Sequence, residues 1–391
     1  MANSIWLYRL FDVAEEINLE QAEKILAHTR STSRVKLSRL PDRSIYFSNP
    51  PVLFNMGRVQ VSLGTRILQG SIFGKLYDLG VVSLVLKLEV PEVGYDPLKE
   101  IAFFLEVKED KSHYNNLDTG IRFKVAERSL PAADASSDSK SKALITEDKF
   151  EETFTEYLES VCQIINPALV KPRNHYFVED FTLFYFTDWN AEWDALPLLL
   201  GEKGPFSSQL REDTLRYSLT YGPDDLTIIT WDAALVYDRT GSPDIPDLLE
   251  FAVCQLLELR YYDYLLNKEM AKMYDAIEET QQKTSYRRYG QYRRITKQLM
   301  ELVVDINEIT ERIQNSLKVT GDIFYARVFR AALDAFRSKV WMESVERKVT
   351  LIQQNYSLLN NEIVNERGAL LEIAIIFLIG LEIILGLLQL L

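Results

Sequence analysis

The stretch around which the chain is organised is Gly368–Leu391, GALLEIAIIFLIGLEIILGLLQLL. It contains no Lys, Arg, Asp, Asn or Pro, and its polar side chains are Glu372, Glu382 and Gln389. A helix of this length spans roughly 36 Å, more than the roughly 30 Å hydrocarbon core of a bilayer. A helix that is apolar on every face is buried in protein or in lipid. We therefore expect residues 368–391 to be a transmembrane anchor, with a buried core helix as the alternative.

The composition is that of an acidic globular protein of two or three domains. The 391 residues carry a formal net charge of −13, and 47% of them are hydrophobic. Phosphate binding needs a basic surface, so this charge argues against nucleic acid as the main partner of the chain as a whole. Cys162 and Cys254 both lie in apolar helical patterns, which is typical of buried thiols in a reducing compartment. No signal peptide is visible. We therefore expect the anchor to lie in the inner (cytoplasmic) membrane and residues 1–367 to lie in the cytoplasm.

Residues 1–240 show strand and helix patterns in irregular alternation. Ile5–Val13 and Val81–Val90 are rich in β-formers, and Leu19–Ala27 has the pattern of a short helix. Residues 131–147 are rich in Ser, Ala, Asp and Lys and contain no aromatic residue, which predicts a flexible loop. The irregular order predicts an α+β domain instead of a regular parallel array.

The pattern becomes helical after Ser242-Pro243, and residues 243–367 are predicted to form a stalk. A first helix is predicted from about Asp247 to Gln282. Two later segments, Tyr292–Ile313 and Val345–Ile363, place apolar residues at alternating spacings of three and four, as in a coiled-coil seam. We expect these two seam helices to form an antiparallel pair, with ordinary helix-bundle packing as the alternative.

A basic segment lies in the stalk, and the predicted pairing places it level with the start of the anchor. Anionic lipid headgroups would bind such a cluster, with the interleaved tyrosines at the interface. The alternatives are a solvated helix face paired with Glu278 and Glu279, and an RNA-binding surface. The basic residues are Lys283, Arg287, Arg288, Arg293, Arg294 and Lys297.

The anchor also carries a polar stripe. Glu382, Gly386 and Gln389 are spaced at i, i+4 and i+7 and therefore share one helix face. A carboxylate within a membrane is costly unless it is neutral or faces protein. We expect self-association, or pairing with another membrane helix, through this face, because glycine allows close packing and the polar groups can hydrogen-bond. A protonated Glu382 at the lipid boundary is the alternative.

No catalytic or cofactor-binding pattern is recognisable in the sequence. His28, His113 and His175 have no Cys or carboxylate at a metal-ligand spacing. Gly74-Lys75 lacks the upstream glycines of a phosphate-binding loop, and neither a dinucleotide-binding motif nor a GxSxG motif occurs. We therefore predict a protein that is not an enzyme and binds no cofactor or metal.

The order of these parts resembles the Rmd family (required for meiotic nuclear division), which includes YagE-like bacterial members of unknown function. The resemblance rests on Leu76–Leu88 (LYDLGVVSLVLKL), on Asp224–Leu266, and on the helical hairpin that runs into the C-terminal apolar stretch. It implies a membrane-bound protein that acts as a scaffold, and it implies no catalytic residues.

The favoured function is a membrane-tethered scaffold that self-associates through its anchor and its coiled-coil stalk and binds an unknown protein partner. The first alternative is an ion-transport component similar in outline to the CorA-type magnesium channels, with one spanning helix per subunit and Glu382 in a ring. The second alternative is an enzyme with an unrecognised site in residues 1–240.

Overall fold

The computed structural model describes residues 3–390 except 29–30, 35–48, 64–65, 91–93, 107–113, 117–121, 128–143, 147–149, 282–289, 291–292, 299, 302, 305 and 307–321. The predicted loop at 131–147 therefore lies almost wholly outside the described residues. The chain forms two compact units. The first contains Met1–Glu258 and Ser316–Lys339, and the second contains Leu259–Asn315 and Val340–Leu391.

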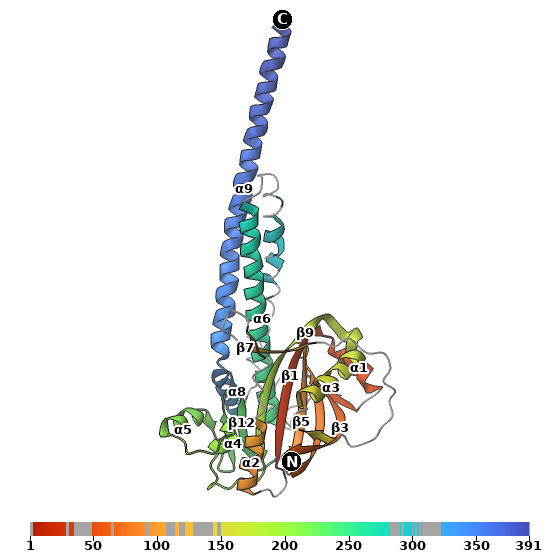
Figure 1. Cartoon of the computed structure of the whole chain (residues 1–391), viewed down its shortest axis with the longest axis vertical. Coiled ribbons are helices and arrows are strands. Elements are labelled where there is room, and N and C mark those ends of the chain that lie inside the picture. Colours follow the sequence, from red (N-terminus) through yellow and green to blue (C-terminus); the bar gives the residue numbers. More distant parts are fainter. Residues whose placement is uncertain are drawn as a thin grey trace. The chain divides into compact units, whose positions relative to one another are not determined.

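The first unit is built on a 12-stranded mixed sheet (Figure 1), in which the main path runs β10-β11-β12-β9-β1-β5-β4-β3-β2. β1 lies between β5 and β9 and is antiparallel to both, whereas β12 is parallel to β9. The bounds of the strands are β1 Ser4–Ile17, β2 Thr32–Arg34, β3 Val52–Leu63, β4 Arg66–Leu76, β5 Val81–Glu89, β6 Tyr114–Asn116, β7 Arg122–Glu127, β8 Leu144–Thr146, β9 Leu169–Phe186, β10 Ser218–Leu219, β11 Asp225–Ile229 and β12 Ala233–Asp238.

Helices flank and follow these strands. Side-chain caps begin two of them: Asn18 accepts a hydrogen bond from the backbone N–H of Gln21, and Asp322 accepts one from that of Phe324. The bounds are α1 Leu19–Ala27, α2 Tyr95–Glu106, α3 Phe150–Ile165, the 3₁₀ helix η4 Asn166–Ala168, α4 Leu196–Leu200, α5 Ser208–Thr214, α6 Asp244–Gln281, α8 Ile323–Ala335 and α9 Ser338–Leu390.

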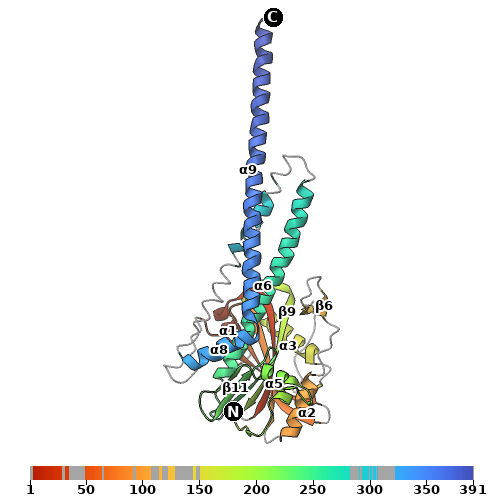
Figure 2. The same ribbon diagram turned by 90° about the vertical axis from the view of Figure 1, so that its left-hand side faces the viewer.

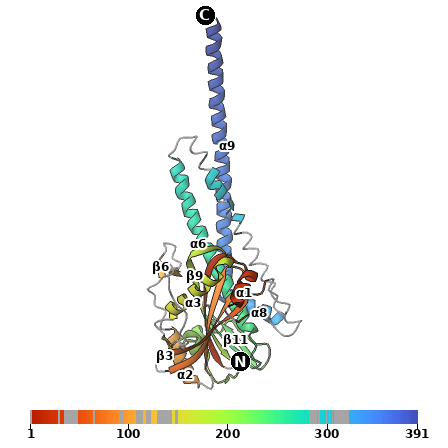
Figure 3. The ribbon, with the colours of Figure 1, turned by 90° about the vertical axis from the view of Figure 1, so that its right-hand side faces the viewer.

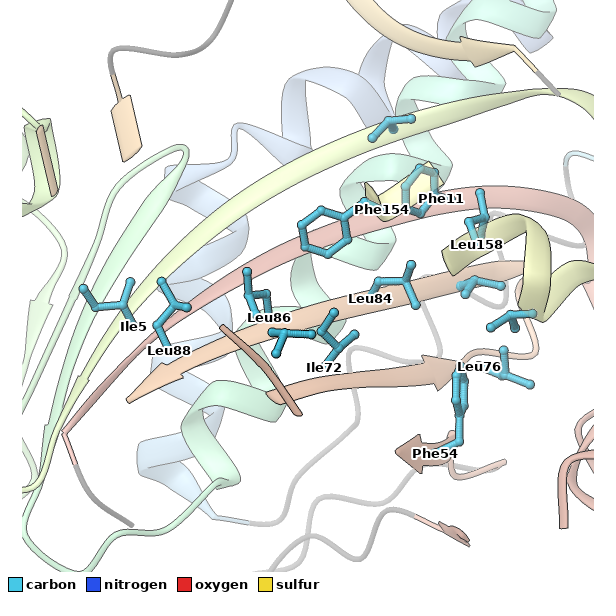
Figure 4. Close-up of a cluster of buried hydrophobic side chains, with 14 of the residues drawn as sticks. Ile5, Phe11, Phe54, Ile72, Leu76, Leu84, Leu86, Leu88, Phe154 and Leu158 are labelled. Carbon is cyan, nitrogen blue, oxygen red and sulfur yellow. The ribbon is translucent and has the colours of Figure 1, made fainter. Parts of the chain in front are cut away.

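One face of the sheet packs into the main hydrophobic core. Alternate residues of a strand point to opposite faces, so Phe11 of β1, Leu84 of β5 and Ile72 of β4 share this face. Phe154 and Leu158 of α3 lie over them (Figure 4). Because both side chains are buried on the same stripe of α3, the amphipathic pattern of that helix fixes which way it faces.

The opposite face of the sheet is covered by α8 and by the first part of α6. The ring of Phe181 on β9 meets that of Phe336 edge to face, with centroids 5.5 Å apart. Phe251 of α6 stacks between Tyr77, which follows β4, and Phe329 of α8. Asp244–Glu258 and α8 are therefore part of the sheet-containing unit.

The second unit contains the rest of α6, residues around 293–306, and most of α9. Val303 and Ile306 share a buried cluster with Leu266 of α6 and with Val349 and Ile352 of α9. The cluster thus joins three segments, whereas the sequence predicted a pair.

Within this unit α6 and α9 run parallel to each other (Figure 2). Ser344 donates a hydrogen bond to Asp263, and Asn355 donates one to Tyr274; both contacts join residues 81 positions apart. Arg260 lies over the ring of Trp341, again 81 positions further on. In a pair of parallel helices the residue numbers of contacting residues keep a constant difference. In an antiparallel pair their sum would be constant instead.

The C-terminal stretch forms the last part of α9. The described side chains of this stretch include the carboxylates of Glu372 and Glu382. In the described part of the chain, no helix is both long and apolar enough to cross a bilayer. This finding overturns the predictions of a transmembrane helix, a tail anchor and an inner-membrane location.

Candidate functional site

Polar side chains gather on the sheet face that α6 covers. The strand register pairs Leu10 of β1 with Ser83 of β5, and Ser83 with Lys75 of β4. Tyr8 and Asp12 lie two residues to either side of Leu10 and share its face. Tyr8, Asp12, Lys75 and Ser83 are all buried, which is unusual for four polar side chains on one side of a sheet.

Helix α6 presents carboxylates to these residues. Asp247 and Glu250 are three positions apart on one helix face, and both are buried. Lys75 Nζ donates hydrogen bonds to Asp247 Oδ1 at 2.6 Å and to Glu250 Oε2 at 2.5 Å. We call Lys75, Asp247 and Glu250 the charge cluster. It joins residues more than 170 positions apart in sequence.

The surroundings shift the protonation of these groups. Burial alone lowers the pKa of Lys75, but the carboxylates of Asp247 and Glu250 outweigh it and hold the pKa above its ordinary value. Burial raises the pKa of Asp247, and the attraction of Lys75 opposes that rise. Burial, with Glu250 and Asp247 nearby, raises the pKa of the Tyr8 hydroxyl well above normal. Lys75 is therefore a permanent cation, and Tyr8 is permanently neutral.

A second buried ion pair lies on the same face. Arg173 of β9 donates to Asp12 Oδ1 at 2.6 Å, beside an irregularity in the β1–β9 register. Burial raises the pKa of Asp12 to about 7, although the Arg173 charge and hydrogen bond lower it. Desolvation wins because the Asp12 side chain is completely removed from water.

Together these six residues, Tyr8, Asp12, Lys75, Ser83, Asp247 and Glu250, form what we call the polar interface between the sheet and α6. Among the described residues no group of three or more His, Cys, Asp or Glu side chains is arranged to hold a metal ion. The three charges of the cluster are completely or nearly enclosed, so the arrangement fixes how α6 sits on the sheet. Sequence reasoning missed it, because Lys75 was considered only as part of a phosphate-binding loop.

The predicted basic patch is only partly described. Lys283, Arg287 and Arg288 lie outside the described residues. Arg293, Arg294 and Lys297 are helical and exposed, and Lys297 lies 3.6 Å from Glu301, one turn further along. Lys297 thus has an acidic neighbour on its own helix, and headgroup binding by the basic segment stays a prediction.

The predicted association face of the tail is described at Glu382, which is exposed; the surroundings of Gly386 and Gln389 lie outside the described side chains. What the structure adds is the apolar surface around Glu382. The exposed residues are Leu371, Ile373, Ile375, Ile376, Phe377, Leu378, Ile379, Leu381, Ile383 and Ile384, each between 43% and 69% exposed. No described element lies beside this end of α9 (Figure 3). So large an apolar surface marks an interaction site.

This apolar surface continues the seam that is buried nearer the start of α9. Val345, Val349 and Ile352 are buried in the second unit. Counting on in the same alternation of three and four leads through Glu366 to Leu370, Ile373, Phe377, Gly380 and Ile384. We call Ile373, Phe377, Gly380 and Ile384 the tail seam. In this frame Glu372 and Glu382 fall on the opposite, outer side of the helix, together with Ile375 and Ile379.

Comparison with known proteins gives the family. The family model described as "Uncharacterized protein MJ0711, N-terminal domain" matches residues 2–244. The chain belongs to the MJ0711 N-terminal domain family. "Uncharacterized protein MJ0711" of Methanocaldococcus jannaschii is 25% identical over 220 residues, which make up 54% of this chain and 66% of that protein, just under two thirds of its length. No solved structure gives a significant match.

The MJ0711 N-terminal domain match takes the place of the predicted Rmd membership, which nothing confirms. Its end at residue 244 coincides with the first residue of α6. Tyr8, Asp12, Lys75 and Ser83 lie inside the matched region, whereas Asp247 and Glu250 lie just beyond it. The sheet side of the polar interface therefore belongs to the family domain.

Proposed function

We propose that this protein is a scaffold that self-associates through the tail seam of α9, with the sheet-containing unit as the part that binds a protein partner. The observation that supports self-association best is the exposed apolar surface of residues 371–384. An apolar surface of this size is unfavourable in water, at roughly 25 cal/mol per Å², and favours whatever arrangement buries it.

The seam pattern favours another helix as the covering element. A three–four alternation presents a narrow apolar stripe that packs against a second helix by knobs-into-holes contacts. The same stripe is already buried against helices within the second unit, at Val345, Val349 and Ile352. The exposed Ile373, Phe377 and Ile384 extend that stripe beyond the helices of this chain.

A second copy of the chain is the partner that fits the seam best. Two identical helices aligned in parallel place Phe377 against Phe377 and Gly380 against Gly380, so each seam residue meets one of the same shape. Glu372 and Glu382 then lie on the outer sides, where the two carboxylates of one copy remain in water, away from those of the other. Since each copy carries a net charge of −13, long-range repulsion must be overcome by apolar contact of this kind.

The test is the molar mass of the purified full chain, measured by light scattering behind size exclusion. We expect a defined oligomer for the wild type and a monomer for a truncation ending at Arg367. A double variant of the seam, Ile373→Asp/Ile384→Asp, should also give a monomer. The matched control is Ile375→Asp/Leu378→Asp, which adds the same charge at residues of similar exposure outside the seam. The control should keep the oligomer.

Two outcomes would overturn the proposal. One is a wild-type chain that is monomeric at all accessible concentrations. The other is equal loss of association in the seam and control variants, which would mean unspecific hydrophobic contact. Cosedimentation with phosphatidylcholine–phosphatidylglycerol vesicles is measured in parallel. If the wild type binds the vesicles, forms no oligomer in solution and loses vesicle binding equally in both double variants, the result also counts against the seam.

A further inference from the structure

The charge cluster holds two carboxylates against one cation. Lys75 Nζ donates to Asp247 at 2.6 Å and to Glu250 at 2.5 Å. Within the described part of the chain, Lys75 is the one cation that pairs with either carboxylate. Asp12 does not enter this balance, because Arg173 is its own counter-charge at 2.6 Å. The cluster therefore has one negative charge in excess when both of its carboxylates are ionised.

Burial makes this excess charge costly. The side chain of Glu250 is completely removed from water, and those of Lys75 and Asp247 are 7% and 12% exposed. The two bonded carboxylate oxygens lie no more than about 5 Å apart, because both accept from the same nitrogen. Two carboxylates this close repel each other, and little water is present to screen them. Proteins neutralise such an excess with a counter-charge or a proton.

Two buried polar atoms beside the cluster also lack a hydrogen-bond partner among the described residues. They are Glu250 Oε1 and Tyr8 Oη. Both side chains are at most 2% exposed. After burial, the charges of Glu250 and Asp247 raise the pKa of the Tyr8 hydroxyl, so this hydroxyl lies within electrostatic reach of both carboxylates. Buried atoms of this kind are rare, and each calls for an unseen donor, acceptor or water molecule.

One proton resolves both difficulties. On Glu250 Oε1 it removes the excess charge and turns an unpartnered acceptor into a donor, for which Tyr8 Oη is an acceptor directly or through a buried water. The Tyr8 hydroxyl can instead donate to Glu250, but the excess charge would then remain. A metal ion fits less well, since the described residues include no group of three or more His, Cys, Asp or Glu side chains arranged to hold one.

We propose that the charge cluster binds one proton, shared by the carboxylates of Asp247 and Glu250, and that its release weakens the attachment of α6 to the sheet. The link to this attachment is direct, because both carboxylates belong to α6 and their shared partner Lys75 belongs to β4. The inference concerns the sheet-containing unit alone and does not depend on self-association through the tail. The contact between α6 and the sheet then responds to proton concentration.

The other titratable groups around the cluster leave its charge balance unchanged. Burial raises the pKa of each neighbouring tyrosine and of the Cys254 thiol, so these groups stay neutral near neutral pH. Arg173 is already paired with Asp12. The groups that face this region are Tyr8 and Asp12 of β1, Tyr77 and Asp78 after β4, Arg173 of β9, Asp244, Cys254 and Glu258 of α6, and Tyr325 of α8, which donates to Asp244.

The linkage to stability has a definite sign. Burial raises the pKa of Asp247; the attraction of Lys75 opposes this rise, and the repulsion of Glu250 adds to it. A carboxyl group whose pKa is raised on folding stabilises the fold fully below its unfolded-state pKa, and this contribution is lost as the pH rises through the folded-state pKa. The attachment should therefore weaken as the pH rises above the ordinary range of a carboxyl group. Release of one proton changes the unfolding equilibrium constant by up to about tenfold per pH unit.

The experiment is urea unfolding of the full chain between about pH 4.5 and about pH 8.5, for the wild type, Glu250→Gln and the control Asp224→Asn. Glu250→Gln places a permanent N–H donor in the cluster and leaves one carboxylate with Lys75. Asp224 is exposed and pairs with Arg239 at 3.5 Å. Asp12 is present in all three proteins, so its own titration cancels in the comparison.

We expect the unfolding equilibrium constants of the wild type and of Asp224→Asn to rise with pH by up to about tenfold per pH unit more than that of Glu250→Gln. Asp247→Asn should behave like Glu250→Gln, because either substitution removes the excess charge. A wild type and a Glu250→Gln variant with the same pH dependence would overturn the proposal.

A second readout does not depend on stability. Infrared difference spectra of Asp12→Asn, which lacks that buried carboxyl group, should show the C=O stretch of a protonated carboxyl group at pH values where exposed carboxyl groups are ionised. The band should disappear as the pH is raised further, and it should be missing when Glu250→Gln is added. If neither Glu250→Gln nor Asp247→Asn folds, Asp12→Asn decides alone, and the absence of a titrating band in its spectra refutes the proton site.

Discussion

Lys75 joins the sheet to α6 through two buried ion pairs. It is 6% exposed and donates to two carboxylates of the same helix. Removing one partner of a buried ion pair costs more than the pair itself contributes, because the remaining charge stays buried without compensation. Lys75 therefore matters for stability mainly because removing it would leave the buried carboxylates of Asp247 and Glu250 without a counter-charge.

We predict that Lys75→Met lowers the free energy of unfolding by about 3–5 kcal/mol. The triple variant Lys75→Met/Asp247→Asn/Glu250→Gln should recover much of this loss, because no buried charge of the cluster is then left alone. Urea unfolding of both proteins measures the difference. Arg239→Met serves as the control, because the Arg239–Asp224 pair is exposed and should contribute less than about 1 kcal/mol. A triple variant that is no more stable than Lys75→Met would contradict the cluster.

The sequence alone did not predict that Lys75 contacts Asp247 and Glu250. Its partners lie more than 170 positions away, and no local motif connects them. Leu249, Ala252, Leu256 and Leu259 of α6 form an apolar stripe at helical spacing, and all four are buried. Asp247 and Glu250 lie off that stripe. What periodicity cannot show is that the other side of the helix is buried too.

At the scale of elements, the turn between β4 and β5 places a glycine where no other residue fits. Gly80 has φ +89°, and a Cβ on it would lie 2.0 Å from the carbonyl oxygen of Ala14 on β1. The carbonyl of Gly80 in turn accepts a hydrogen bond from Val13 N–H. The turn is therefore packed directly against the central strand, where β1 departs from regular pairing with β9.

We predict that Gly80→Ala destabilises the protein by more than about 2 kcal/mol, from backbone strain together with displacement of β1. Gly57→Ala is the matched comparison. Gly57 also has positive φ, at +112°, but nothing lies within 4 Å of its added Cβ. It should therefore show the strain alone. Chemical denaturation of both variants gives the comparison, and equal losses would show that the contact with Ala14 is unimportant.

Most element types follow from the sequence, and the exceptions have physical causes. The helix Leu19–Ala27 is observed with the predicted bounds, and the predicted strand Val81–Val90 is observed as β5. The β-rich run 225–237 forms a hairpin, β11 and β12, in which Thr230 closes the tight turn by bonding to Ala233. The direction of α6 relative to α9 was not predictable, since each helix carries its own seam and periodicity does not choose the partner.

At the scale of the whole molecule, the sheet-containing unit does not end where its last strand ends. It includes the first part of α6 and all of α8. Buried side chains such as Leu248, Phe251 and Val328 cover the sheet face that carries Tyr8 and Leu10. A chain cut after β12 would expose that face to water.

We predict that a fragment of residues 1–240 does not fold cooperatively, although it contains every strand described here. It should bind a hydrophobic dye and show a broad unfolding transition, because the sheet keeps only one covered face. The full chain should unfold with a sharp transition in the same buffer. Cooperative melting of the fragment, with a dispersed amide NMR spectrum, would show that α6 and α8 are dispensable.

The tail shows where composition misleads. Its apolar sequence predicted a membrane helix, but that prediction considered residues 368–391 without the helix that precedes them. In the structure they extend a 53-residue helix that begins at Ser338. The frame of the buried seam then places Ile373, Phe377 and Ile384 on the seam side, and places Glu372 and Glu382 on the outer side with Ile375 and Ile379. That distinction requires knowing which residues are buried further back along the same helix.

The constant difference of 81 between contacting residues of α6 and α9 also limits how this protein can change length during evolution. Eleven residues separate Asp263 from Tyr274, and eleven separate their partners Ser344 and Asn355. An insertion of seven residues between the contacts in one helix alone would displace one contact by about 10 Å along the axis. Insertions and deletions in this region should therefore occur in matched pairs, of equal size in both helices, among homologous chains that keep this pairing.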